Sequence, residues 1–148
     1  MTRFAAVGMR NRRAVPLAEI VDGSIDDFSQ FVVDSVAAGW RVVAIFGMPE
    51  KNGNTRLIGI VADDHEGRLA AGATLVGARY PALTPFCPQV HAFEREIAEQ
   101  TGLRPDGHPW PDPVRFAAPL AQPARGAAAK PVAPGQSGTT TSGRSETT

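Results

Sequence analysis

Cysteine is almost absent from this chain, which has one, Cys87, among 148 residues. A single thiol excludes an internal disulfide framework, an iron–sulfur cluster held by this chain alone and a multi-cysteine zinc site. It is typical of a protein of the reducing cytoplasm. Cys87 and His91 lie one helical turn apart, as a nucleophile and its base would. Because no third group is evident to orient that base, we interpret Cys87 as a buried structural thiol.

Long hydrophobic runs, an excess of one charge and phosphate-binding motifs are missing as well. No apolar run approaches the roughly twenty residues that span a bilayer, and the N-terminal residues do not have the pattern of a secretion signal. Lys plus Arg and Asp plus Glu both number 15, so no net field attracts nucleic acid or an anionic membrane. No glycine-rich nucleotide-binding motif occurs. We therefore expect that any association with a membrane is made through a partner.

The N-terminal end is a local exception to this balance of charge, because its basic residues all precede the first acid. Two interpretations stay open, a solvated basic end and a contact with an acidic surface of a partner. The residues concerned are Arg3, Arg10, Arg12 and Arg13.

One amphipathic helix and several strands are predicted in the first half of the chain. Ser24 is a suitable N-cap, apolar residues recur at helical spacing after it, and Gly39 ends the helix. Residues 40–46 and 55–62 are rich in β-formers and are predicted to pair as an antiparallel hairpin. Residues 13–20 are expected to form an edge strand or an extended segment, and residues 68–79 a further strand.

Strands framed by helices predict an α+β fold, a single domain with a small, mostly antiparallel sheet and helices packed on one face. The second face or an edge of so small a sheet stays partly apolar unless loops, the N-terminal segment or another protein cover it. The domain is expected to span residues 1–116. Residues 117–148 are rich in Ala, Pro, Gly, Ser and Thr, a composition that predicts a flexible low-complexity tail.

A second helix is predicted between Pro88, which suits a first helical turn, and Gly102, which suits a left-handed end. On a helical wheel its apolar residues form one narrow stripe, with acidic residues on both borders and charged residues pointing away. The stripe holds Val90, Phe93 and Ile97, the borders Glu94 and Glu96, and the outer face Arg95 and Glu99.

Residues 79–109 combine a proline-framed loop, this helix and a Gly-His-Pro turn. The motifs are Tyr80-Pro-Ala-Leu-Thr-Pro85, Phe93-Glu-Arg-Glu-Ile97 followed by Glu99 and Gly102, and Gly107-His-Pro109. In these motifs the chain resembles the thirty-kilodalton subunit family of respiratory complex I, and more closely its version in energy-converting nickel–iron hydrogenases and formate hydrogenlyase. It departs from the family pattern at Gln100-Thr101, at Leu103 and in the approach Cys87-Pro-Gln-Val90. The strong match covers about a fifth of the chain.

The resemblance implies a cofactor-free accessory subunit of a membrane-associated oxidoreductase, non-catalytic by itself. Its expected partners are the large catalytic subunit, of the nickel–iron hydrogenase or the complex I type, and the iron–sulfur subunit of the same complex. Its expected location is cytoplasmic, peripheral on the inner face of the cell membrane. Arg95 is expected to bind a partner carboxylate through its planar fork, while Glu94 and Glu96 direct it and receive partner donors. The expected partner-binding residues are Glu94, Arg95, Glu96, Glu99, Gly107, His108 and Pro109.

An alternative from a different class is a small metallohydrolase that uses His91, Glu94 and His108. Three such ligands suit zinc, although their spacing matches neither the His-Glu-x-x-His helix nor the Glu-x-x-His pairs of di-iron bundles. Without a metal, His108 is expected to donate a hydrogen bond that fixes its turn. Glu94, Arg95 and Glu96 would then belong to a solvated helix face with weak surface pairs. A free-standing assembly factor that binds the large subunit transiently is a third possibility.

Overall fold

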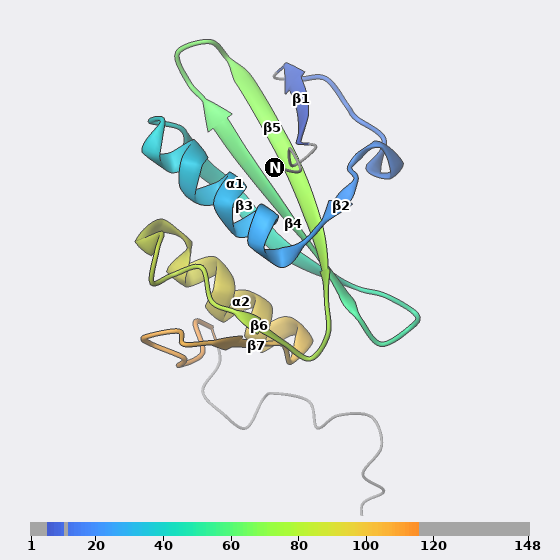
Figure 1. Ribbon diagram of the computed structural model, residues 1–148, viewed down its shortest axis with the longest axis vertical. Coiled ribbons are helices and arrows are strands. Elements are labelled where there is room, and N and C mark those ends of the chain that lie inside the picture. Colours follow the sequence, from blue (N-terminus) through green and yellow to red (C-terminus); the bar gives the residue numbers. More distant parts are fainter. Residues whose placement is uncertain (1–5, 11, 116–148) are drawn as a thin grey trace, which may run out of the picture.

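The computed structural model describes residues 6–10 and 12–115, so the tail expected at residues 117–148 lies outside the described residues. In Figure 1 two helices lie side by side in front of a sheet, and a short strand pair lies below them. The strands are β1 Val7–Arg10, β2 Asp22–Gly23, β3 Arg41–Pro49, β4 Thr55–Asp63, β5 Arg68–Val76, β6 Arg79–Pro81 and β7 Arg104–Asp106; the α-helices are α1 Ile25–Ala37 and α2 His91–Thr101; and the short 3-10 turns are η1 Leu17–Glu19 and η2 Pro88–Val90.

The predicted α+β class and mostly antiparallel sheet are confirmed. The main sheet has the order β1-β5-β4-β3, all antiparallel, and β2 adds a short parallel pairing to β5. The predicted hairpin is the β3–β4 pair, in which Phe46 lies opposite Ile58. A separate two-stranded parallel sheet, β6–β7, was not predicted from the sequence. Each of its strands has three residues, too few for an alternating pattern to be recognised.

Helix α1 begins and ends where the sequence predicts. The Ser24 hydroxyl accepts a hydrogen bond from the Asp27 backbone N–H at 3.0 Å, which satisfies one of the free donors of the first turn. Gly39, just past the helix, has a φ of 88°, a conformation that glycine adopts without steric cost. Helix α2 is preceded by the short turn η2 and followed by Gly102 in the left-handed conformation. The expected apolar stripe is confirmed, because Val90 and Ile97 are buried and Phe93 packs against the same core.

Both helices pack on one face of the sheet, and two glycines let them approach it closely. A Cβ built on Gly59 of β4 would lie 3.0 Å from Phe28 Cζ of α1. A Cβ on Gly47 of β3 would lie 3.4 Å from Ile97 Cγ2 of α2. Gly47 pairs with Leu57, two residues before Gly59 and therefore on the same face. The main core lies between this face and the helices.

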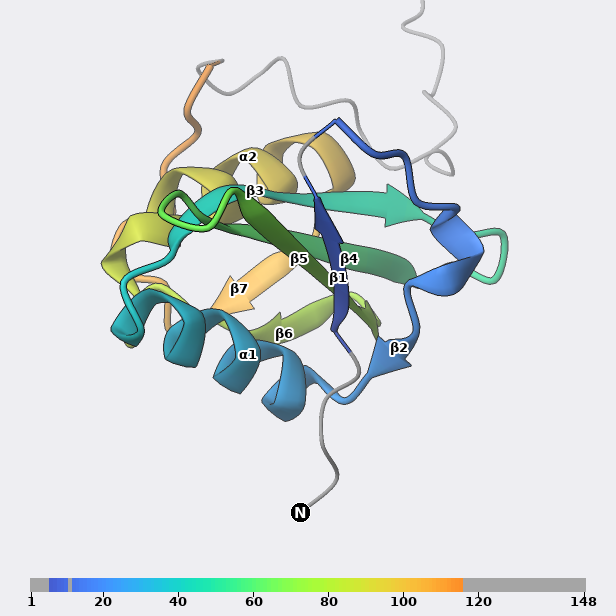
Figure 2. The ribbon, with the colours of Figure 1, turned by 90° about the horizontal axis from the view of Figure 1, so that it is seen from above.

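The N-terminal segment covers part of the second face. Ile20 packs against Ile58, Ala71 and Ala73 there. Arg56 holds this segment by an ion pair to Asp22, with Arg56 Nε 2.6 Å from Asp22 Oδ1, and by a hydrogen bond to the Ile20 carbonyl. Figures 1 and 2 show β2 at the side of the fold away from α2.

Of the two alternatives expected for residues 13–20, the edge strand is wrong. These residues hold the 3-10 turn η1, and the strands of this region lie on either side of them, in β1 and β2. Pro16 precedes the turn and has no N–H to donate to a sheet ladder. Part of the second face stays apolar and accessible at Phe46 and Leu75, which are 38% and 43% exposed. Among the described residues, no helix is both long and apolar enough to cross a bilayer.

Candidate functional site

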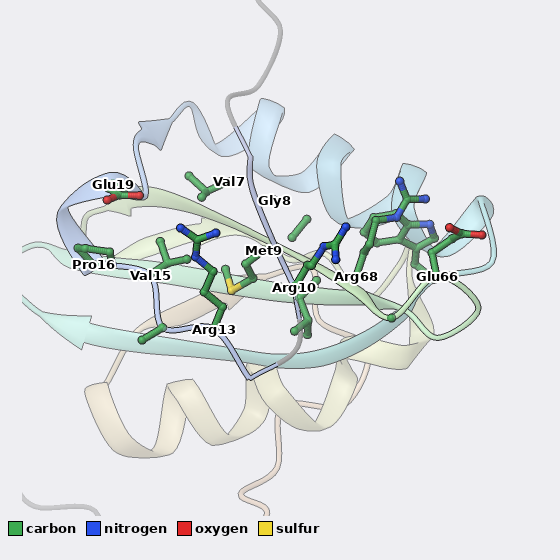
Figure 3. A pocket seen from close by; sticks show the side chains of 15 residues that line it. Val7, Gly8, Met9, Arg10, Arg13, Val15, Pro16, Glu19, Glu66 and Arg68 are labelled. Carbon is green, nitrogen blue, oxygen red and sulfur yellow. The ribbon is translucent and has the colours of Figure 1, made fainter.

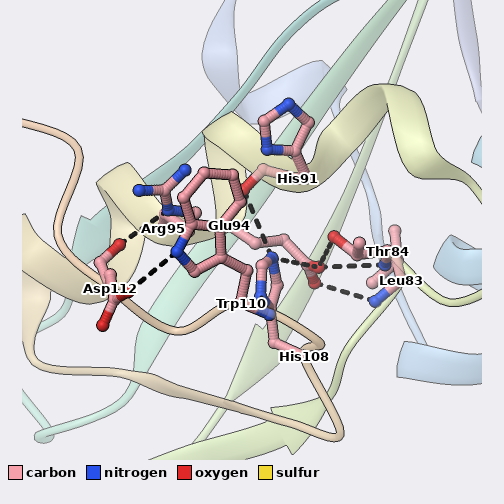
Figure 4. Close-up of polar contacts among 8 residues, drawn as sticks. All are labelled: Leu83, Thr84, His91, Glu94, Arg95, His108, Trp110 and Asp112. Carbon is pink, nitrogen blue, oxygen red and sulfur yellow. Dashed lines mark hydrogen bonds and ion pairs between the residues drawn. The ribbon is translucent and has the colours of Figure 1, made fainter.

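The expected partner-binding residues lie on and around α2. Figure 4 shows Glu94 and Arg95 of α2 together with His108 of the turn that follows β7 and with Trp110 and Asp112 beyond it. His108 Nε2 is 3.3 Å from the His91 carbonyl oxygen, so the Gly-His-Pro turn contacts the first turn of the helix. Residues 110–115, which we name the C-terminal strap, continue from this turn and contact the outer face of α2.

Glu94 faces the interior, so the expectation that it receives donors from a partner is corrected. Its side chain is 1% exposed. Its two carboxylate oxygens accept hydrogen bonds from the Leu83 N–H at 2.8 Å, the Thr84 N–H at 2.9 Å and the Thr84 hydroxyl at 2.6 Å. The loop between β6 and η2 leaves these donors without a backbone acceptor, and a buried carboxylate is stable only when it is so satisfied. Glu94 therefore fastens this loop to α2.

Tyr80 lies beside this carboxylate, and its hydroxyl is buried. Burial, and then the negative charge of Glu94, raise the pKa of Tyr80 above its ordinary value. Ionising it would place a second negative charge in the same apolar region. Tyr80 therefore stays a neutral phenol, and it contributes its ring to the core.

His108 fixes its turn by hydrogen bonds to the main chain, as the sequence predicted. Its Nδ1 accepts from the Trp110 backbone N–H at 3.0 Å. A ring that accepts at Nδ1 carries its hydrogen on Nε2, which donates to the His91 carbonyl. The same Nε2 is 3.9 Å from Glu94 Oε2, and both side chains are 1% exposed. His108 thus joins the turn to the helix.

Arg95 binds the strap. Its Nε donates to the Asp112 carbonyl at 2.6 Å and its Nη2 to the Pro113 carbonyl at 3.1 Å. The guanidinium also lies over the Trp110 ring, 4.4 Å from the centroid, and Trp110 Nε1 donates to Asp112 Oδ2 at 2.8 Å. The fork that was expected to bind a partner carboxylate is directed to two consecutive carbonyls of the chain itself.

The two outer glutamates of α2 also contact the strap. Glu99 Oε2 accepts from the backbone N–H groups of Val114 and Arg115, each at 3.1 Å. Glu96 forms an ion pair with Arg115 and accepts a hydrogen bond from Gln100. Three of the expected residues therefore form one ridge with the strap: Arg95, Glu96 and Glu99. Of the turn residues, Gly107 has a φ of 81°, and both Gly107 and Pro109 are exposed.

The residues of the metal alternative are not brought together. His91 is exposed and offers its carbonyl, not its ring, to His108, and the rings of the two histidines point apart in Figure 4. The Glu94 oxygens are occupied by loop donors. Within residues 6–10 and 12–115 no group of three or more His, Cys, Asp or Glu side chains is placed to hold a metal ion.

Cys87 is 3% exposed and belongs to the main core, as expected for a structural thiol. Burial raises the pKa of its thiol, and the negative charge of Glu94 acts in the same direction. The thiolate, the reactive form, is therefore disfavoured.

We expect a thiol reagent such as Ellman's reagent to modify the native protein about tenfold or more slowly than the protein unfolded in urea at pH 8, because Cys87 is both inaccessible and protonated. The control is an unfolded-state rate that matches a cysteine-containing peptide. Equal rates for folded and unfolded protein would restore Cys87 as a candidate nucleophile.

Two of the N-terminal arginines, Arg10 and Arg13, line a separate, open groove of about 1040 Å³ beside β1, shown in Figure 3. Arg10 lies opposite Arg68 in the β1–β5 pairing, and Arg13 follows on the connecting segment. Glu19 and Glu66 also line this groove. Its cations are therefore mixed with acids, which agrees with the solvated interpretation of this end.

Several residues of the site were not identified from the sequence. Trp110, whose ring lies against Arg95, follows directly after the Gly107-His-Pro109 motif. No sequence pattern predicts that the backbone N–H and the hydroxyl of Thr84 donate to Glu94. Arg79 and Arg104 lie opposite each other in the β6–β7 pair, which the sequence did not predict. The one available signal was the clustering of Trp and Pro after residue 108, which is typical of an ordered, extended segment.

No family model and no curated protein matches the chain.

Proposed function

We propose that this chain is a cofactor-free accessory subunit of a membrane-associated oxidoreductase, which docks and positions the large catalytic subunit. The complex would be of the energy-converting hydrogenase type or of the NADH:quinone oxidoreductase type. The proposal rests on the resemblance of residues 79–109 and on where those residues lie. The subunit would be held at the inner face of the cell membrane through its partners.

One observation carries the structural part of the proposal, the mixed character of the surface around α2. Three large apolar side chains stay in contact with solvent there, two of them in the strap that binds the charged ridge and one in the 82–87 loop that Glu94 fastens to α2. Arg and Trp are the side chains most enriched at the energetic centres of protein interfaces. Exposed large apolar side chains close to charged groups are typical of an interaction surface. They are Phe86, 74% exposed, Trp110, 56% exposed, and Val114, 45% exposed.

The mechanism that this surface supports is positional. Glu94 fastens the 82–87 loop to α2, and His108 fastens the turn to the same helix, so the loop, helix and strap form one rigid unit. A rigid unit loses little conformational entropy on binding, which improves affinity without additional contacts. Such a clamp would keep the metal site and the iron–sulfur cluster of the partners at a fixed separation.

The proposal is tested by co-expressing the tagged chain with the large and iron–sulfur subunits of such a complex from the same organism. We expect purification in mild detergent to recover all three together. Recovery of the chain as a lone monomer, with the partners present and folded, would count decisively against the proposal.

Replacing Arg95 by alanine is expected to abolish this assembly, because the strap that presents Trp110 then loses two of its hydrogen bonds to α2, while the melting temperature of the isolated chain changes little. Its contacts are to the exposed strap and not to the core, and surface contacts of this kind contribute about 1 kcal/mol or less. The matched control is Arg41→Ala, at the start of β3, where the side chain is 57% exposed and pairs with Asp64. A large fall in melting temperature for Arg95→Ala would show that the residue is simply structural.

A further inference from the structure

A second groove, of about 350 Å³, lies between β7 and α2. Three arginines line it, Arg79 from β6, Arg95 from α2 and Arg104 from β7, and Asp106 is the one acid among its lining residues. The buried His108 ring closes one part of the wall. One concave site is therefore lined by three guanidinium groups and by one carboxylate.

The arginines differ in how far their donors are used. Arg79 donates to Asp106 in a bidentate fashion, with Nε at 3.0 Å and Nη2 at 2.7 Å from the carboxylate. Arg95 uses two donors on strap carbonyls. Arg104 makes no hydrogen bond or ion pair through its side chain to the described residues. Its five N–H donors are free for a ligand.

The alignment of the two short strands concentrates this charge. Arg79 and Arg104 occupy directly opposite positions, and Asp106 lies two residues after Arg104, on the same side of its strand. Like charges in this arrangement repel each other. Both cations lower the pKa of Asp106, Arg79 by a hydrogen bond and by its charge, and Arg104 by its charge. The carboxylate therefore stays ionised, yet it offsets only one of the positive charges.

We infer that this groove receives an acidic side chain from the docking segment of the partner subunit, bound chiefly by Arg104 with support from Arg79. The inference rests on the proposed function and names the chemistry of the partner at this site. A guanidinium fork matches a carboxylate in a planar, two-bonded geometry. Pro111 of the strap lines the same groove, next to the exposed Trp110. The cationic site therefore continues into apolar surface, an arrangement that a protein segment can cover.

The groove itself is tested with the full chain and a synthetic tetraglutamate peptide, followed by backbone amide chemical shifts. We expect saturable shifts at Arg79, Arg104 and Gly107, and we expect Arg104→Gln to weaken binding by about two- to fivefold, the range of one solvent-exposed ion pair. Tetraglutamine should cause no shifts. Arg10→Gln, which removes the same charge from the exposed β1 strand, should leave the dissociation constant unchanged.

Equal weakening by Arg104→Gln and Arg10→Gln would overturn the site, because binding would then follow net charge alone. Saturable binding of inorganic phosphate without binding of tetraglutamate would also overturn it, since the groove would then be a site for small oxyanions. If Arg104→Gln loses binding and its spectrum without peptide also differs from that of the wild type, the substitution has disturbed the fold. Arg104→Lys, which keeps the charge, is then the test. It should bind with an affinity between those of the wild type and Arg104→Gln.

The co-purification assay separates this inference from the proposed function. If the three subunits assemble and Arg104→Gln does not weaken the complex, the groove inference fails and the function stands. If tetraglutamate binds as expected and no large subunit is recovered, the groove is real and the proposed function fails. If both hold, Arg104→Gln should speed the dissociation of the large subunit by about two- to fivefold.

Discussion

Replacing Glu94 by alanine is expected to lower the free energy of unfolding by about 3–5 kcal/mol, because three buried donors lose their acceptor together. The substitution leaves two backbone N–H groups and the Thr84 hydroxyl without acceptors in the interior. Each unsatisfied buried group costs about 1–3 kcal/mol. Glu94→Gln should cost less, about 1–3 kcal/mol, because the amide oxygen still accepts while its NH2 group faces donors. Urea unfolding followed by circular dichroism measures both.

The control for Glu94 is Glu96→Ala in the same helix, where the side chain is 33% exposed and the change should stay within about 1 kcal/mol. Similar small effects for both glutamates would contradict the structural role of Glu94 and return it to the solvated helix face. A destabilised Glu94 variant that still assembled with the large subunit at low temperature would show that this carboxylate acts on the fold and not on the partner.

Replacing Phe28 by alanine is expected to cost about 3–5 kcal/mol, the range measured for a fully buried phenylalanine. Phe28 is 0% exposed, and its ring rests on the backbone of β4 at Gly59, where no side chain can be added without a contact of 3.0 Å to Phe28 Cζ. The closeness of helix and strand leaves little room for the cavity to collapse. Thermal and urea unfolding of the full chain should both report the loss.

Phe86→Ala is the matched control for Phe28, because the same atoms are removed from a side chain that is 74% exposed. Its effect on stability should lie within about 0.5 kcal/mol. On the proposed function it should instead weaken assembly with the large subunit, since Phe86 belongs to the exposed apolar surface. A Phe28→Ala variant as stable as Phe86→Ala would mean that α1 does not pack on the sheet as described.

Much of the fold follows from short-range patterns. The limits of α1 were predicted from Ser24 and Gly39, because capping and left-handed residues act within one turn of the helix end. The β3–β4 hairpin was predicted because the two apolar segments are neighbours along the chain. At residues 13–20 the sequence left an edge strand and an extended segment open, because an extended pattern does not distinguish a strand from a connection between strands.

Gly59 shows where such patterns stop being informative. Within an apolar strand a glycine reads as a weak point. Here the missing side chain of Gly59 leaves space for the Phe28 ring, which belongs to a helix about thirty residues earlier in the sequence.

The sequence by itself determined the class of fold and the apolar stripe of α2, because composition and periodicity fix which side chains must leave water. Only the tertiary structure decided how the charged residues of α2 divide. Glu94 turned inward because loop amides distant in sequence needed an acceptor, and Arg95 bound the strap because two carbonyls and an aromatic ring lay within its reach. A charged side chain at the border of a helix face can satisfy its hydrogen bonds inside or outside, and the partners that other segments bring to it decide which.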